Sequence, residues 1–492
     1  MRFSLRANVR ILLSLITILA IVSAFMVSVV MRGPTTHASA PATQFQGTPS
    51  TIALAHTMQF PVTGTGRLPT GVGPRLPLIP RHSSSSSTAA VRSQVARAAD
   101  AGIATGTGVG QVLQNFAGLN SVDNFKANGF LLEPPDQGLC VGNLKGTAAV
   151  SEIINDVVTF YTPNGKPLSS IANLNVFFNE PAVEFISDPR CYFDPSTQAF
   201  FFTVLAIDPT AVISNHVDIL VLRAADLSMF IFRVDVTFAT NTAGKCPCLG
   251  DQPKLGIDQQ NVYITVDQFD TTLTFETGDS LIAISKSRLV AGASVVHTAV
   301  FNNLALAGIG VTSLQPAITN STSNVEFLLN AFPYADEAQL VDNTISNTLG
   351  LWALAHPQVV STGGVPTLSA TTITSEIYGF PVPALTTNGL SLATFSNDSR
   401  MQQVQYINGH LFGVLDSAVA VGGDPVTRDG AAWFEISPVV NSSGQIVAGK
   451  FTDQGYIAAK GKYLVYPAIT QEELSSLLTL KALLNYQDTH LV

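Results

Sequence analysis

The sequence predicts an all-β protein: a β-propeller of about six blades that follows a leader and a linker. Three observations predict this class. A strand–turn–strand unit recurs along the body, helical periodicity is nearly absent there, and only 12% of the 492 residues are charged. Short β-rich strands bounded by turn residues are typical of all-β folds. The composition excludes a disordered chain, and the net charge of −9 argues against a nucleic-acid-binding protein of the basic kind.

Residues 1–40 have the features of a signal peptide or of an N-terminal membrane anchor. Three arginines precede an uncharged, mostly apolar run, Ile11–Met31, and Ala38–Ala40 fits the small-residue pattern of a cleavage site. The run is long enough to span a bilayer, so cleavage and retention both remain open. Because the basic flank precedes the run, the body is expected to be extracellular or at the cell surface, with membrane contact only through residues 11–31.

Residues 41–110 are expected to form a flexible linker. Pro, Gly, Ser and Thr are frequent, Ser83–Ser87 is a homopolymer, and neither the strand period nor the helix period persists. The first 99 residues contain nine Arg, no Lys and no acidic residue, whereas the rest of the chain is acidic. This asymmetry indicates a tether followed by a globular body.

Residues 111–469 are predicted to form the propeller. Each unit starts with a polar anchor, continues with two short strands and a tight turn, and ends with a more apolar strand. The anchors recur every 52 to 83 residues: Pro135-Asp136, Asp188-Pro189, Asp251–Pro253, Gln315-Pro316, Asp398 and Gln454-Gly455. A blade takes about 40–50 residues, so this period favours a propeller over a sandwich. The long interval after Gln315 leaves room for a seventh blade, and a right-handed β-helix is the rival fold.

Local signals define the turns and the end of the chain. Asn408-Gly409 between two apolar runs is the strongest hairpin signal. Thr470 and Glu473 form a capping box, and the leucines after them follow a helical spacing, so residues 470–492 are predicted to be a C-terminal helical tail. Gln111–Phe116 is a candidate for the strand that closes the ring.

Four cysteines in an exported chain predict two disulfides. Cys140 and Cys191 follow their anchors at nearly the same distance, and equivalent positions of adjacent blades lie close together. Cys140–Cys191 is therefore the expected bridge, which leaves Cys246 to pair with Cys248. The other connectivities and a zinc site built from all four cysteines are the alternatives, although the spacing lacks two Cys-x-x-Cys pairs.

Three segments carry a resemblance to a known family. Pro134–Asn143 reads PPDQGLCVGN, Ser187–Asp194 reads SDPRCYFD, and Cys246–Asp258 reads CPCLGDQPKLGID. Together, between about Asn115 and Ile469, they resemble exported bacterial β-propeller-like proteins with no assigned activity. The resemblance implies a propeller and export, and no chemistry. The chain departs from the family pattern after Ile469, which puts the closure of the ring in question.

No recognised catalytic motif occurs, so site candidates rest on residue type and position. Arginines that could bind a carboxylate are Arg190, Arg223, Arg233, Arg288, Arg400 and Arg428. Acid/base candidates on predicted strands are Glu152, Glu326 and Glu435. For each of these, a strand-edge or loop charge is the plainer interpretation. The eight histidines are scattered and suggest no metal site.

Asp136, Asp188 and Asp251 recur at one position of three consecutive units. Three carboxylates around a shared axis repel one another, and a bound Ca²⁺ would relieve that repulsion. The plainer interpretation is that each carboxylate accepts hydrogen bonds from its own turn.

The sequence therefore predicts a secreted or surface-tethered propeller that acts as a binding or scaffold module for an unknown glycan or protein. The alternative is an extracellular glycan-processing enzyme, a hydrolase or lyase, with acidic residues at the propeller channel. A mainly structural protein of the cell envelope is a third possibility. Carboxylates that converge with arginine in one place would favour the enzyme, since glycoside hydrolysis needs a carboxyl pair.

Overall fold

The structure is a computed structural model, and it describes residues 42–61, 115–130, 136–208, 214–238, 246–270, 276–320, 323–332, 345–382, 384, 398–470 and 481–484. Residues 41–492 belong to one compact unit. The apolar run Ile11–Met31 and most of the predicted linker lie outside the described residues. No helix within the described ranges is long and apolar enough to cross a membrane.

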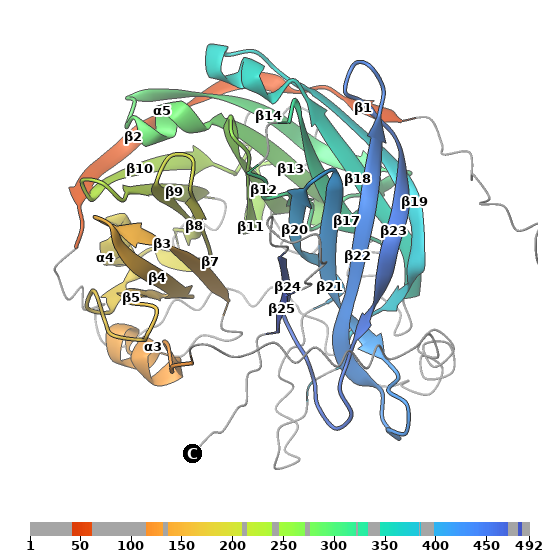
Figure 1. The fold of residues 1–492 in the computed structure, drawn as a ribbon. Coiled ribbons are helices and arrows are strands. Elements are labelled where there is room, and N and C mark those ends of the chain that lie inside the picture. The colour runs from red at the N-terminus through yellow and green to blue at the C-terminus, as the bar shows by residue number, and fades with distance from the viewer. Residues whose placement is uncertain are drawn as a thin grey trace, which may run out of the picture. The chain divides into compact units, whose positions relative to one another are not determined.

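Most described strands group into five blades, each an antiparallel meander of four consecutive strands (Figure 1). β2 (Thr48–Gln59) joins blades 2 and 3 into one ten-stranded sheet, β1 (Thr43–Phe45) extends blade 4 to five strands, and β24 (Pro467–Thr470) and β25 (Lys481–Leu484) form a separate two-stranded sheet. Blade 1 contains β3 (Gln137–Leu144), β4 (Thr147–Ile154), β5 (Val157–Tyr161) and β6 (Ala172–Asn173). Blade 2 contains β7 (Phe185–Asp194), β8 (Ala199–Ile207), β9 (Asn215–Arg223) and β10 (Ser228–Asp235). Blade 3 contains β11 (Leu249–Ile257), β12 (Asn261–Phe269), β13 (Glu276–Ser285) and β14 (Val295–Leu306), with β15 (Ile309–Gly310) paired to β14.

Blade 4 contains β16 (Gln315–Pro316), β17 (Val325–Ala331), β18 (Ile345–Ala355) and β19 (Thr367–Gly379). Blade 5 contains β20 (Met401–Ile407), β21 (His410–Val419), β22 (Arg428–Val440) and β23 (Ile446–Ile457). Short helices connect the strands: α3 (Ser121–Asn128), α4 (Leu174–Phe178), α5 (Lys286–Val290) and the 3₁₀ helix η2 (Pro357–Thr362).

The blades stack face to face, which is the defining packing of a propeller. Alternate residues of β8 belong to different cores: Phe200 and Phe202 pack with blade 1, whereas Phe201 packs with blade 3. Further cores join blades 3 and 4 and blades 4 and 5. Because side chains alternate along a strand, a central strand buried on both faces reads as a continuous apolar run, as β8 does.

The first strands of consecutive blades lie next to one another. β3 packs against β7, β7 against β11, β11 against β16 and β16 against β20. Ile318 makes parallel bridges to Ile257 of blade 3 and to Gln405 of blade 5. The hairpin predicted at Asn408-Gly409 is confirmed, because it joins β20 to β21 with φ of 52° and 88°, a left-handed pair that only Asn and Gly adopt easily.

The described residues contain five blades rather than six. The first five anchors lie at the start of first strands, but Gln454-Gly455 lies in β23, the last strand of blade 5. Within the described part of the long interval after Gln315 there is one blade, which includes η2 and the long strands β18 and β19. The strands expected around residues 456–466 therefore do not open a sixth blade.

The chain end also differs from the prediction. Lys481–Leu484, expected in a helix, form β25, which pairs with β24 (Pro467–Thr470). β24 packs against β20 and β21 of blade 5. The backbone of residues 481–484 pairs with the edge of β24. Residues 471–480 and 485–492 lie outside the described residues. Of the proposed closing strand Gln111–Phe116, the structure describes Asn115 and Phe116, and neither residue is in a strand.

Part of the predicted linker is a structural element. β1 (Thr43–Phe45) pairs with β19, and β2 (Thr48–Gln59) pairs with β14 through its first half and with β10 through its second. Figure 1 shows this red segment along the outer strands of blades 2, 3 and 4. Outer strands expose unpaired backbone groups, and residues 43–59 satisfy them. The alternation of larger and smaller residues from Ile52 to Met58 is a strand signal that the composition of the region conceals.

Candidate functional site

Buried acidic residues gather at one end of the blades. We define the proximal end as the end at which the first and third strands of each blade begin. Nine of the thirteen buried acidic residues that the structure describes lie there: Asp156, Glu180, Asp188, Asp218, Asp267, Asp279, Asp398, Asp416 and Asp429. Buried carboxyl groups are costly unless they are paired or functional, so this end is where chemistry is to be sought.

The anchors mark irregularities of the first strands. The pairing register shifts between Ser187 and Arg190 in β7 and between Asp251 and Lys254 in β11. Asp188 and Gln252 have positive φ, of 53° and 46°. A bulge needs a residue that tolerates such a conformation, and it redirects the side chains beside it. The anchors of β7 and β11 thus place bulges with polar residues at the proximal end.

The three anchor aspartates do not form a common metal site in the described residues. Asp188 accepts a hydrogen bond from the Ser187 hydroxyl at 3.1 Å, and Asp251 lies opposite Asp267 in the β11–β12 ladder. Asp136 directly precedes β3. The described side chains that gather within metal-ligand range are others, Glu180, Glu184 and His216. Binding of Ca²⁺ remains a prediction.

Asp156 and Asp188 are two buried carboxyl groups that interact electrostatically where blades 1 and 2 meet. Asp156 lies in the turn between β4 and β5 and is buried. Burial raises the pKa of Asp156 to about 8, against a hydrogen bond from Asn124 that lowers it, and the negative charge of Asp188 adds to the rise. Asp156 is therefore protonated at neutral pH and can donate a proton.

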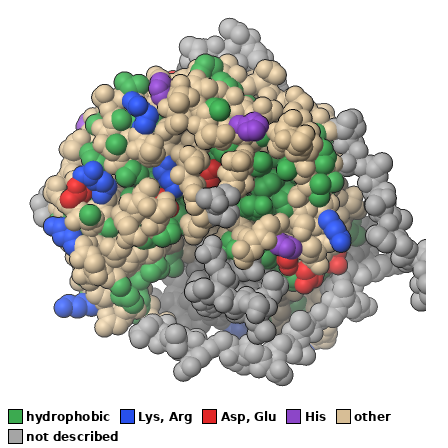
Figure 2. Space-filling model, turned by 45° about the horizontal axis from the view of Figure 1, so that its top comes forward, with side chains coloured by type: hydrophobic (Ala, Val, Ile, Leu, Met, Phe, Trp, Pro, Cys, Tyr) green, Lys and Arg blue, Asp and Glu red, His purple; other side chains and the backbone are tan. Residues whose placement is uncertain are grey.

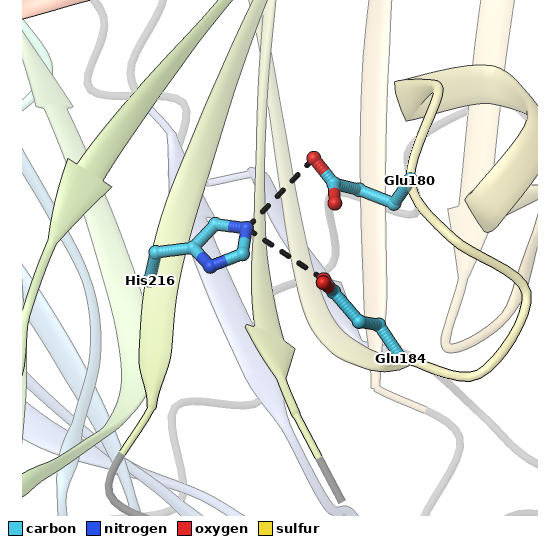
Figure 3. A group of neighbouring side chains, drawn as sticks. All are labelled: Glu180, Glu184 and His216. Atoms are coloured by element: carbon cyan, nitrogen blue, oxygen red, sulfur yellow. Dashed lines mark ion pairs between the residues drawn. The ribbon is translucent and has the colours of Figure 1, made fainter. Parts of the chain in front are cut away.

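Glu180, Glu184 and His216 form a second group nearby (Figure 3). The two glutamates lie in the connection between α4 and β7, and His216 is the second residue of β9. The His216 Nε2 atom is 3.8 Å from Oε1 of Glu180 and 3.9 Å from Oε2 of Glu184. Asp218, two residues along the same face of β9, places Oδ1 3.6 Å from that nitrogen, and Arg233 of β10 binds Glu180.

Burial and mutual contact perturb every carboxyl of this group. Burial and the adjacent Glu180 raise the pKa of Glu184 to about 7, and burial raises the pKa of Asp218 to about 6. Burial opposes ionisation of Glu180 and of His216, yet the oppositely charged groups around them outweigh it. They lower the pKa of Glu180 to about 2 and raise the pKa of His216 to about 9. Perturbed groups of this kind concentrate at functional sites.

The predicted arginines do not form one cluster. Arg233 joins the glutamate–histidine group, and Arg400 pairs with Asp398 and with Asp267. Arg223 and Arg428 form local pairs with Asp226 and Asp424, Arg288 binds the carbonyl of Val295, and Arg190 binds the carbonyl of Pro189.

Arg400 belongs to a network that joins blades 3 and 5. Lys254 Nζ is 2.9 Å from Oδ1 of Asp267, and Arg400 is 3.4 Å from its Oδ2. The Ser313 backbone also donates to Asp267 at 2.8 Å. Asp267 and Lys254 are almost fully buried, so we interpret the network as a structural connection between blades.

The predicted acid/base glutamates lie in three different blades. Glu152 of β4 accepts the Leu119 N–H at 2.8 Å, Glu326 of β17 is fully buried, and Glu435 of β22 pairs with His410 at 2.8 Å. No hydrogen bond or ion pair found among the described residues joins two of them. They do not form a catalytic pair.

Both expected disulfides are present. Cys140 of β3 is bonded to Cys191 of β7, with Cα atoms 5.6 Å apart, and Cys246 is bonded to Cys248. No described cysteine is free, which excludes the four-cysteine zinc site in this structure. The first bridge joins the innermost strands of blades 1 and 2, β3 and β7, and Asp188 lies on β7.

The four residues of this group, Glu180, Glu184, His216 and Asp218, are not among the site residues predicted from the sequence. A signal was present, because His216-x-Asp218 on a predicted strand places two ligand types on one face. Their approach to Glu180 and Glu184 depends on how the α4–β7 connection folds over blade 2. The spacing of these residues along the sequence does not predict that arrangement.

No family model matches the chain, and no curated protein is similar to it in sequence. Among solved structures it is similar to a GH43 β-1,3-galactosidase, with 13% identity over 67% of this chain and 61% of that one, at a TM-score of 0.29. An α-L-arabinanase from Penicillium chrysogenum in complex with arabinobiose has 9% identity over 65% of this chain and 94% of that one, at a TM-score of 0.32. The WD40 domain of SCAP from fission yeast has 8% identity over 66% and 63%, at 0.25. Likenesses at this level assign neither a family nor an activity.

Proposed function

We propose that the protein is an extracellular glycan-processing β-propeller that hydrolyses glycosidic bonds with carboxyl groups at its proximal end. The observation that carries the proposal is that burial raises the pKa of Asp156 to about 8 and that Asp188 is close enough for its negative charge to add to the rise. Glycoside hydrolysis needs an acid that protonates the leaving oxygen and a carboxylate that assists on the other side of the bond. A carboxyl whose pKa is raised, as that of Asp156 is, suits the role of the acid.

In this proposal Asp156 is the general acid and Asp188 the assisting carboxylate. The Cys140–Cys191 bridge holds the two innermost strands of this region together. A rigid scaffold favours catalysis because reacting groups must keep their geometry. The positive φ of Asp188 also supports a functional role for this residue, since strained backbone positions are enriched at functional sites.

The test is release of reducing ends from polysaccharides by the purified chain. Arabinan and β-1,3-galactan are the first substrates to use, because the names of structural neighbours mention them. Asp156→Asn and Asp188→Asn should each lower the rate by about 10²–10⁴-fold, the usual contribution of general acid–base catalysis. Asp226→Asn, at an exposed turn where Asp226 pairs with Arg223, is the control and should keep full activity.

Two other outcomes are informative. Saturable binding of a polysaccharide without release of sugar would support the binding module that the sequence favoured. Neither binding nor release across a broad panel of glycans would overturn both proposals.

We also propose that the protein is exported and belongs with the exported propeller-like proteins that it resembles. Two disulfides support this location, because they persist in oxidising compartments. A chain expressed with its first 40 residues should be found outside the cytoplasm, and a chain that lacks them should stay inside.

A further inference from the structure

The group around His216 has the composition of a metal site. An imidazole nitrogen and two carboxylate oxygens, from Glu180, Glu184 and His216, all lie within 4.8 Å of one another. Oδ1 of Asp218 adds a fourth ligand atom at 3.6 Å from the same nitrogen. Figure 3 shows the two glutamates approaching the ring nitrogen from the connection that precedes β7.

Buried polar atoms in this group lack hydrogen-bond partners among the described residues. They are Oε2 of Glu180, Oε2 of Glu184, Nε2 of His216 and both carboxylate oxygens of Asp218. The side chains of Glu180 and Asp218 are fully buried. Buried polar atoms are nearly always hydrogen-bonded, so several in one place call for a ligand that coordinates them together.

The charges of the group point to a divalent cation. The group contains three carboxyl groups, those of Glu180, Glu184 and Asp218. Within the described residues, Arg233 is the one arginine that forms ion pairs with this group. Binding of a metal ion requires the His216 imidazole to give up its proton. The neutral imidazole, three carboxylates and one arginine then leave two negative charges. A divalent ion would neutralise them and would bind the lone pair that a neutral imidazole offers.

We propose that Glu180, Glu184, Asp218 and His216 form a binding site for a divalent transition-metal ion, with Zn²⁺ as the ion that fits best. Ca²⁺ prefers an all-oxygen set, whereas Zn²⁺ combines imidazole nitrogen with carboxylate oxygen. Ligand atoms around tetrahedral Zn²⁺ lie about 3.4 Å apart. The distances of 3.6 to 3.9 Å around Nε2 approach this value. The carboxylate oxygens of Glu180 and Glu184 lie within 4.8 Å of each other, so metal binding would draw the carboxylates closer together.

The ion would fasten the connection between blades 1 and 2 to the third strand of blade 2. Glu180 and Glu184 come from that connection, and His216 and Asp218 come from β9. The His216 and Glu184 side chains remain 12% and 16% exposed, which leaves an approach from solvent. This proposal is independent of glycan hydrolysis, and its readout is metal binding.

The test is calorimetric titration of the tag-free, EDTA-stripped chain with Zn²⁺, together with thermal unfolding. We expect one tightly bound equivalent and a higher melting temperature with zinc. His216→Ala and Glu184→Gln should each weaken binding by at least about 10-fold and remove most of the thermal shift. His410→Ala is the matched control, because His410 pairs with one carboxylate only, Glu435, and should keep the affinity unchanged.

Glu184→Gln keeps the volume of the side chain, so it tests the site even if His216→Ala fails to fold. The proposal is overturned if the native chain binds no zinc at micromolar concentration, or if both site variants bind it as tightly as the native chain. Displacement of the zinc by millimolar Ca²⁺ would also contradict the assigned ligand chemistry.

Discussion

Glu326 shows how burial changes the role of a single residue. The sequence places it on a strand as an acid/base candidate, but the structure buries it completely in blade 4. Burial first, and the negative charge of Asp258 second, hold the pKa of Glu326 well above its usual value of 4.5. A residue with no access to solvent acts on folding rather than on a substrate.

The pH dependence of this effect can be predicted. An acid whose pKa is raised in the folded state makes the folded chain bind a proton that the unfolded chain releases, so stability falls as pH rises above about 4.5. Glu326→Gln should therefore raise the free energy of unfolding at pH 8, by roughly 1 kcal/mol or more, and change it little at pH 4. Urea denaturation at both pH values checks this.

Asp453→Asn, at an exposed position of β23, is the control for the loss of one negative charge. An equal destabilisation of Glu326→Gln at both pH values would instead mean that the carboxyl makes specific contacts that an amide cannot replace.

At the scale of elements, β2 differs most from the prediction, because the sequence predicts a flexible linker where the structure has a 12-residue strand. Its backbone joins the outer strands of two blades, and Ile52 packs into the core between blades 2 and 3. Ile52→Asp should lower the free energy of unfolding by about 3 kcal/mol, because it leaves a carboxylate in an apolar core.

An aspartate introduced three residues later, at position 55, separates the effect of lost packing from the effect of the added charge. Ala55 is exposed on the opposite face of β2, so Ala55→Asp should stay within about 0.5 kcal/mol of the native chain. Chemical denaturation of both variants measures the difference. Equal effects, or none for Ile52→Asp, would mean that β2 contributes little to the fold.

At the scale of the whole molecule, the Cys140–Cys191 bridge connects two blades across a sequence separation of 51 residues. Closing a loop of this length stabilises by about 4 kcal/mol in the chain-entropy description. Replacing both cysteines by serine should cost about that much. The Cys246–Cys248 bridge spans 2 residues, so its double serine variant should cost only about 1.5 kcal/mol. Denaturation under non-reducing conditions compares the two, and equal losses would contradict the loop-length argument.

The sequence by itself determined the features that depend on neighbouring residues or on equivalent positions of a repeat. Alternating apolar residues and turn chemistry predicted an all-β chain, and Asn408-Gly409 joins two strands because both residues accept a positive φ. The first five anchors mark the starts of first strands, and at two of them, in β7 and β11, the conformation needed at a bulge restricts the residue types. Cys140 and Cys191 pair because the repeat places them on adjacent first strands.

Only the tertiary structure decided the features that depend on distant parts of the chain. The number of blades follows from which strands find partners, and Gln454-Gly455 carries an anchor pattern yet lies in an outer strand. Residues 43–59 become strands because blades far along the chain offer them open edges. Glu180 and His216 meet because the α4–β7 connection folds over β9, and the charged neighbours that this fold brings together outweigh burial in setting the charge of both groups.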